Sequence, residues 1–208
     1  TLTVSGSSIG GGTSTGAISV YNLIKAGAGT TTFANDGTNS VNNDLSINAG
    51  TLTLSLRNTD TNGVRVATGT TFNVNGNLNI NGGDLTTAGT GVIDTTAGTP
   101  TITINGTGNI GGGTSTGAIT IYNLTTAGTG TTTFQNDGVN TIDNNVSVGA
   151  GTTLNFNDSI SIAGNLANTT SGVIGYSGTP NVTVQGATIG GGTTGAISFY
   201  DLTKSGAG

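Results

Sequence analysis

The segment IGGGTSTGAISVYNLIKAGAGTTTFANDG, residues 9–37, decides how this chain folds, because it returns as IGGGTSTGAITIYNLTTAGTGTTTFQNDG at residues 110–138. The two copies are identical at 23 of 29 positions, and a third, shortened copy begins at residue 189. Such self-similarity is typical of proteins in which one structural unit is stacked many times. It predicts one continuous solenoid over residues 1–208, with long repeats at 9–109 and 110–188 and a partial repeat at 189–208.

A shorter period runs beneath the long one. Gly-Thr steps recur at Thr30, Thr51, Thr70 and Thr90, which is a spacing of about 20 residues. The same period divides the first long repeat into five short repeats and the second into four. It predicts that the second unit lacks one complete layer. Removing a whole layer from a stack leaves the packing of its neighbours intact.

Composition favours strands over helices. The 208 residues include 39 Gly but no Glu, Met, Cys, His or Trp, and charged residues make up only 6%. Strings such as TLTLSL and TITI alternate apolar and polar residues, as half-buried strands do. Parallel strands normally need helical crossovers, and no segment has helical spacing. We therefore predict an all-β, right-handed parallel β-helix of roughly ten coils, each of about 20 residues and stacked about 4.8 Å apart.

The repeated segment also predicts which side chains form the core. Alternation places Ile18 and Val20 inside, Tyr21 outside, and Leu23 inside after a bend. Phe33 and its counterpart Phe134 are expected to fill the core. The glycine triplets are expected at corners whose backbone excludes a Cβ atom, namely Gly10 to Gly12, Gly111 to Gly113 and Gly190 to Gly192.

Several functional classes are disfavoured by what the chain lacks. The only cations are Lys25, Arg57, Arg65 and Lys204, too scattered to neutralise a run of phosphates, so no nucleic-acid partner is expected. No apolar run is long enough to span a bilayer as a helix, so no membrane insertion is expected. Without His, Glu or Cys we predict no enzyme, with no catalytic, cofactor-binding or metal-binding residues.

A carbohydrate-active enzyme is the third hypothesis, and it requires a groove that holds two Asp within about 10 Å of each other. The best sequence candidate is LRNTDTNGVR, which contains Arg57, Asp60 and Arg65. A solvated patch with a weak ion pair is the favoured interpretation of this cluster, because exposed ion pairs contribute little.

Turn aspartates and glycines suggest two further sites, both weakly. Asp36 and Asp137 belong to NDG turns, with Asp44 and Asp143 following, and such oxygens are common calcium ligands. Ordinary Asx turns explain them better, because no calcium-binding loop pattern is present. The triple glycines lack the GK[ST] sequence of a phosphate-binding loop, which disfavours a nucleotide.

Outward-facing residues offer two binding hypotheses. Pairs such as Thr51/Thr53 resemble the hydroxyl arrays of ice-binding solenoids, but they do not recur in every coil, which favours ordinary surface threonines. Tyrosines at one phase of the repeat would provide sparse aromatic contacts for glycans or a neighbouring filament if they faced outward, although corner packing is favoured; they are Tyr21, Tyr122 and Tyr200.

The repeats GTLTLSL, GTTFNVNGNLNINGG and GTTLNFNDSISIAGNL resemble those of bacterial surface-exported β-helices of the filamentous-haemagglutinin and autotransporter-passenger type. That resemblance implies a secreted stalk or adhesin. We expect a structural extracellular fibre or adhesin shaft, with a glycan- or ice-binding outer face as the alternative. Neither end of the sequence carries a polar cap, so the expected partner is the chain's own continuation in a longer solenoid or a second copy stacked end to end.

Overall fold

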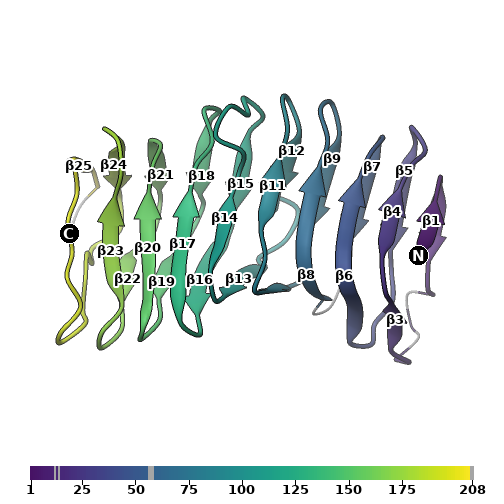
Figure 1. The fold of residues 1–208 in the computed structure, drawn as a ribbon, viewed down its shortest axis with the longest axis horizontal. Coiled ribbons are helices and arrows are strands. Elements are labelled where there is room, and N and C mark those ends of the chain that lie inside the picture. The colour runs from purple at the N-terminus through teal and green to yellow at the C-terminus, as the bar shows by residue number, and fades with distance from the viewer. Residues whose placement is uncertain (12, 14, 56–58, 207–208) are drawn as a thin grey trace.

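The computed structural model describes every residue except 12, 14, 56–58 and 207–208. Its described part contains 25 strands and no helix. All of the strand pairings are parallel, and the chain winds through about nine turns that lie side by side from the N- to the C-terminus (Figure 1). The predicted β-solenoid is therefore confirmed.

Each turn contributes strands to three stacks. Stack 1 contains β3 (Ile18–Val20), the first part of β6 (Asn39–Ile47), the first part of β8 (Thr59–Val66), β10 (Leu78–Asn81), β13 (Thr101–Asn105), β16 (Asn123–Ala127), β19 (Val146–Val148) and β22 (Leu166–Asn168). Stack 2 contains β1 (Leu2–Val4), β4 (Leu23–Lys25), the second parts of β6 and β8, β11 (Leu85–Thr87), β14 (Gly108–Ile110), β17 (Gly130–Phe134), β20 (Thr152–Phe156) and β23 (Val173–Tyr176).

Stacks 1 and 2 join through the long strands β6 and β8 into one sheet of 15 strands. Stack 3 is the separate ten-stranded sheet, made of β2 (Ser7–Ile9), β5 (Thr30–Phe33), β7 (Thr51–Leu54), β9 (Thr71–Val74), β12 (Val92–Asp94), β15 (Ile119–Ile121), β18 (Asn140–Ile142), β21 (Ile160–Ile162), β24 (Asn181–Val184) and β25 (Asp201–Lys204). The only register shift among the described pairings lies between β6 and β8, so stack 3 is regular throughout.

Coil length varies, and its average exceeds the predicted period. Phe33 pairs with Leu54, an offset of 21, whereas Ile93 pairs with Ile119, an offset of 26. The longer coil includes the corner segment 111–118, which forms no strand. The Gly-Thr steps counted in the sequence, from Thr30 to Thr90, end before this segment, so their spacing underestimates the mean coil length. The structure has about nine turns of roughly 21 residues instead of the ten shorter coils that the sequence predicts.

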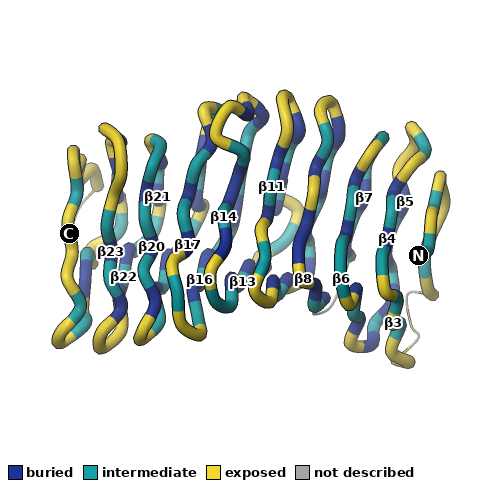
Figure 2. The backbone as a smooth tube through the Cα atoms, viewed as in Figure 1, coloured by how far each residue is buried: buried dark blue, intermediate teal, exposed yellow. Residues whose placement is uncertain are grey.

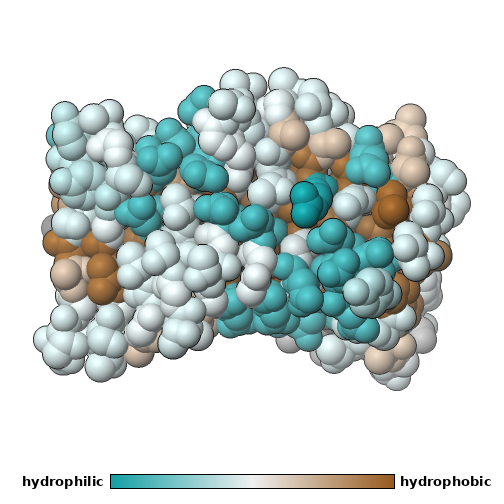
Figure 3. All heavy atoms as spheres, viewed as in Figure 1, coloured by the Kyte–Doolittle hydropathy of each residue, from teal (hydrophilic) through white to brown (hydrophobic). Residues whose placement is uncertain are grey.

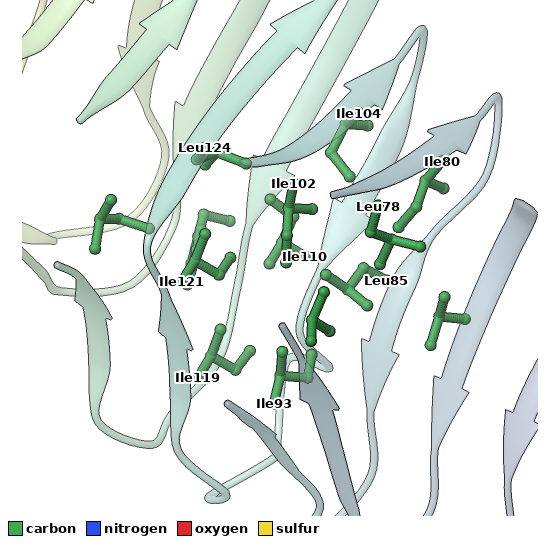
Figure 4. Close-up of a cluster of buried hydrophobic side chains, with 14 of the residues drawn as sticks. Leu78, Ile80, Leu85, Ile93, Ile102, Ile104, Ile110, Ile119, Ile121 and Leu124 are labelled. Carbon is green, nitrogen blue, oxygen red and sulfur yellow. The ribbon is translucent and has the colours of Figure 1, made fainter. Parts of the chain in front are cut away.

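One hydrophobic core runs through the stack. Leu23 and Phe134 are fully buried, Phe33 is 3% exposed, and all belong to a single cluster of buried side chains. Side chains from adjacent coils, such as Ile102 and Leu124, lie next to one another in it (Figure 4). Burial alternates along the strands (Figure 2), as the sequence pattern predicts. Tyr21, predicted to point outward, is 64% exposed.

Glycines mark the corners. The first residue of each triplet has a positive φ: 80° at Gly10, 86° at Gly111 and 95° at Gly190. At Gly111 a Cβ atom would also overlap the carbonyl oxygen of Gln135 in the next coil. The prediction that these glycines occupy positions closed to side chains is confirmed at these three residues, but it is wrong for Gly11 and Gly113, where an added Cβ atom would meet nothing within 4 Å. Gly12 lies outside the described residues.

Candidate functional site

The long repeat is out of step with the coil. The motif that forms β3 in stack 1 forms β15 in stack 3 in the second copy. In the third copy the same position, Ile197, bridges to Ile174 of β23 in stack 2. Each copy is therefore rotated by one stack relative to the copy before it, so that equivalent residues point in three different directions.

The rotation corrects the predicted division into five and four short repeats. The chain passes through 14 strand positions from β3 to β15 and 11 from β15 to Ile197. With three positions per turn, the two units hold four and two-thirds and three and two-thirds turns. Their difference is one complete turn, so the prediction that the shorter unit lacks a whole layer is confirmed.

Because of this rotation, the three repeated tyrosines do not form a row. Tyr21 lies between stacks 1 and 2, Tyr122 between stacks 3 and 1, and Tyr200 just before stack 3. Tyr200 is 53% exposed, and its ring centroid lies 6.2 Å from that of Tyr176. The hypothesis that repeated tyrosines line up for a glycan or a neighbouring filament is therefore wrong. The sequence alone predicts a row because it suggests that each long repeat contains a whole number of coils, which would place equivalent residues on the same side of the solenoid.

Buried asparagines fasten the repeated segment to the adjoining coils. Asn136 is fully buried, and its Nδ2 donates to the carbonyl of Gly117 at 2.9 Å and to Oδ1 of Asn140 at 2.8 Å. Asn140 donates back to the Asn136 carbonyl at 2.7 Å. The Thr87 hydroxyl donates to Oδ1 of Asn136 at 3.3 Å, which joins segments 49 residues apart. The amide is therefore fully used within the protein.

The first copy repeats this arrangement. Asn35 donates to the carbonyl of Gly16 at 2.6 Å and to Oδ1 of Asn39 at 2.8 Å. In both NDG turns the asparagine makes a hydrogen bond to the adjoining coil. Asp137 is exposed. Among the described residues, no group of three or more His, Cys, Asp or Glu side chains is placed to hold a metal ion.

Backbone crowding explains why glycines recur in the segment. A Cβ atom at Gly37 would overlap the carbonyl of Gly16, and one at Gly138 would overlap the carbonyl of Gly117. Each copy of the segment spans more than one coil, so its two ends touch. Packing of the segment against itself therefore explains the identity between copies.

Substitution of Asn136 by Ala is expected to lower the free energy of unfolding by about 3 kcal/mol, because buried hydrogen-bond partners are left unsatisfied. Asn155→Ala is the control, since its side chain bonds Ser177 on the surface; we expect a change within about 0.5 kcal/mol. Urea unfolding followed by circular dichroism measures both. Equal effects of the two substitutions would contradict the fastening role.

A pocket of about 160 Å³ lies where β6 and β8 pass from stack 1 to stack 2. Hydrophilic side chains gather on this part of the surface (Figure 3). Asp44 and Asp84 line the pocket from coils on either side of Gly63, which has no side chain to fill the gap. Two coil spacings place their backbones roughly 10 Å apart. This is the described site closest to the paired carboxylates of the enzyme hypothesis.

The contacts of these carboxylates do not suit glycoside hydrolysis. Asp44 Oδ2 faces Arg65 Nε at 3.9 Å, and Asp84 Oδ1 accepts from the Asn109 amide N–H at 2.7 Å and from its Nδ2 at 3.2 Å. Both carboxylates are therefore already in contact with protein groups, whereas a glycosidase presents both of its carboxyl groups to the sugar. The pocket is also smaller than the roughly 300–1,000 Å³ of sites that enclose ligands. We assign no reaction to it.

The structure separates the charged cluster considered in the sequence. Asp60 lies in stack 1, where its Oδ1 accepts from Asn79 at 2.8 Å, while Arg65 lies in stack 2 beside Asp44. Among the described residues, Arg65 therefore pairs with Asp44 and not with Asp60, because β8 turns between Asp60 and Arg65. The Asp44–Arg65 pair is weak, with side chains 42% and 70% exposed. Arg57 lies outside the described residues.

The outward side of stack 3 carries a row that sequence motifs did not reveal. Strand register aligns one outward residue from each of the ten strands: Ser8, Thr32, Thr53, Asn73, Asp94, Thr120, Thr141, Ser161, Thr183 and Thr203. Eight of the ten bear a hydroxyl. Thr53 belongs to the pair Thr51/Thr53 considered in the sequence, but most members come from different motifs of the rotated copies, so no single Thr-x-Thr pattern marks the whole row. We call these ten residues the hydroxyl row.

Comparisons with protein-family models, curated proteins and solved structures give no significant match. Within the described residues, no helix is both long enough and apolar enough to cross a membrane.

Proposed function

We propose that this protein is the shaft of an extracellular fibre or surface adhesin, with a structural role and no catalysis. The observation that carries the proposal is the uninterrupted core. Buried side chains pass from Leu23 through Leu45 and Val64 to Leu85 along stack 2, each in register with the next. In a protein built this way the distance between the two ends grows with the number of similar layers. A shaft requires this property, because its function is to hold its two ends apart.

The hydrogen-bond pattern supports this role. Neighbouring coils are joined by parallel ladders, and side chains add bonds in the same direction, such as Asn43 Nδ2 to Asn22 Oδ1 at 2.9 Å and Asn144 Nδ2 to Asn123 Oδ1 at 3.0 Å. Each layer depends mainly on its neighbours, so the scaffold tolerates gain or loss of layers. The repeat units, which differ by one turn, are an example.

The style of the repeats supports the extracellular and adhesin parts of the proposal, through the resemblance to surface-exported β-helices of the filamentous-haemagglutinin and autotransporter type. A chain without Cys, Met, His or Trp also withstands oxidising surroundings. The proposed partner is a further length of solenoid, in the same chain or in a second copy. The scattered tyrosines give no support to a glycan-binding row.

Electron microscopy of the native protein tests the proposal. We expect unbroken rods on the cell surface or in the medium, with an axial repeat of about 4.8 Å. Localisation of the protein with an antibody identifies the compartment in the same experiment. Short, free particles that do not associate, or a protein confined to the cytoplasm, would contradict the shaft.

A further inference from the structure

The hydroxyl row is the most regular surface feature of the molecule. Consecutive members, such as Thr120, Thr141, Ser161 and Thr183, are direct register partners. They therefore lie about 4.8 Å apart, one per coil. The equivalent outward row of stack 1 contains hydroxyls at only five of its eight positions and is interrupted by acid, amide and methyl groups; it consists of Ser19, Ser40, Asp60, Asn79, Thr103, Thr125, Ser147 and Ala167.

Most hydroxyls of the row are free to bind water. Of the eight, only Thr53 and Thr203 make a hydrogen bond to another side chain in the described structure, with Asn73 at 3.4 Å and Asn181 at 3.3 Å. The other six are unbonded within the described protein. Threonine side chains are stiff at χ1, so their hydroxyls and methyls hold fixed positions. Binding of a ligand that matches this spacing therefore costs little side-chain entropy.

A second outward row lies beside the first on the same sheet and adds hydroxyl and apolar groups. Thr30, Thr51 and Thr71 are register partners, followed by Val92. Ala118 and Val139 continue the row, and Val139 is 72% exposed. Across both rows there is no cation, and the only acids are Asp94 and Asp201. The surface is therefore nearly uncharged, and most of its side chains carry hydroxyl or methyl groups.

We propose that the outward face of stack 3 binds ice. The axial spacing of one hydroxyl per coil is close to the repeat of oxygen atoms on an ice surface, and methyl groups between the hydroxyls let the adjoining water take an ordered arrangement. The face lacks the aromatic rings on which sugar rings stack, which disfavours a polysaccharide. It also lacks the charged pairs and broad apolar area that would specify a protein partner. This function is additional to the proposed shaft.

Partitioning of the purified protein into slowly growing ice tests the proposal, with inhibition of ice recrystallisation as a second readout. The unmodified protein is expected to enter the ice. Thr141→Lys with Ser161→Lys, neighbours in the hydroxyl row, should abolish this enrichment. The matched control is Thr103→Lys with Thr125→Lys, neighbours at the equivalent outward positions of stack 1, which should retain it. Circular dichroism establishes that each variant is folded.

A milder pair covers the case in which lysines prevent folding. Thr120→Val with Thr141→Val keeps the side-chain shape and removes two hydroxyls, and it should reduce enrichment in ice. Exclusion of the unmodified protein from ice, to the same degree as an unrelated soluble protein, would overturn the proposal. Equal loss in both lysine pairs would overturn it as well. Neither result bears on rod formation, so the proposal of a shaft is tested separately by electron microscopy.

Discussion

A single methyl group at Gly117 is expected to lower the thermal midpoint of the protein by roughly 6 to 12 °C. In Gly117→Ala the new Cβ atom would overlap the carbonyl oxygen of Gly91 in the neighbouring coil. Neither group is a flexible side chain, so two backbones must move apart and the ladder between them must open. We expect a cost of about 3 kcal/mol, the upper end for overpacking, which corresponds to this midpoint shift in a chain of this length.

Gly113 provides the matched control, because it lies in the same corner segment and an added Cβ atom would meet nothing within 4 Å. Gly113→Ala should change the free energy of unfolding by no more than about 0.5 kcal/mol. Thermal unfolding followed by circular dichroism at one scan rate compares the two variants. If they unfolded at the same temperature, the close approach of coils at Gly117 would be refuted.

Deletion of a complete coil should leave a folded protein. Removal of residues 51–70 joins Gly50 to Thr71, and Thr71 is the register partner of Thr51. Strand β9 then takes the place of β7 on β5, with Phe72 replacing Leu52 in the core. We expect cooperative unfolding at a midpoint within about 5 °C of that of the parent, because only one of about nine layers is lost.

Deletion of residues 51–60 removes only half as much chain and serves as the control. It brings segments of different stacks into one position, so apolar side chains that faced the core would face solvent. We expect this variant to be unfolded or aggregated, as seen in the strand signal of circular dichroism and in size-exclusion chromatography. Equal behaviour of the two deletions would show that the layer is not the unit of folding.

The sequence carries enough information to predict the architecture. Alternation in AISVYNL correctly assigns Leu23 to the core, Ile18 to a partly buried position packed against the core, and Tyr21 to the outside, because period-two burial is a local property of a strand. The repeated NDG turns and glycine triplets were also correctly placed at corners. Their hydrogen-bond partners, such as Gly117 for Asn136, lie 19 residues away and become evident only once the coil length is known.

The surfaces could not be predicted in the same way, because they depend on the register between coils. Tyr21 and Tyr122 occupy equal positions in the repeat, but the units contain a fractional number of turns, so the two side chains lie at different corners. Conversely, Thr32 and Thr120 belong to different motifs and share one row. A small difference in mean coil length decides between these outcomes.

Chemical cross-linking tests the stacking of coils most directly, and the absence of native cysteine removes any background. Thr120 and Thr141 are register partners on stack 3 although a whole coil of chain separates them. The double variant Thr120→Cys/Thr141→Cys should react rapidly with a short thiol-to-thiol linker. In the double variant Thr125→Cys/Thr141→Cys the two residues are closer in sequence but lie on different sheets, so the linker should not join them. Rapid linking of the second pair, or none in the first, would contradict the solenoid.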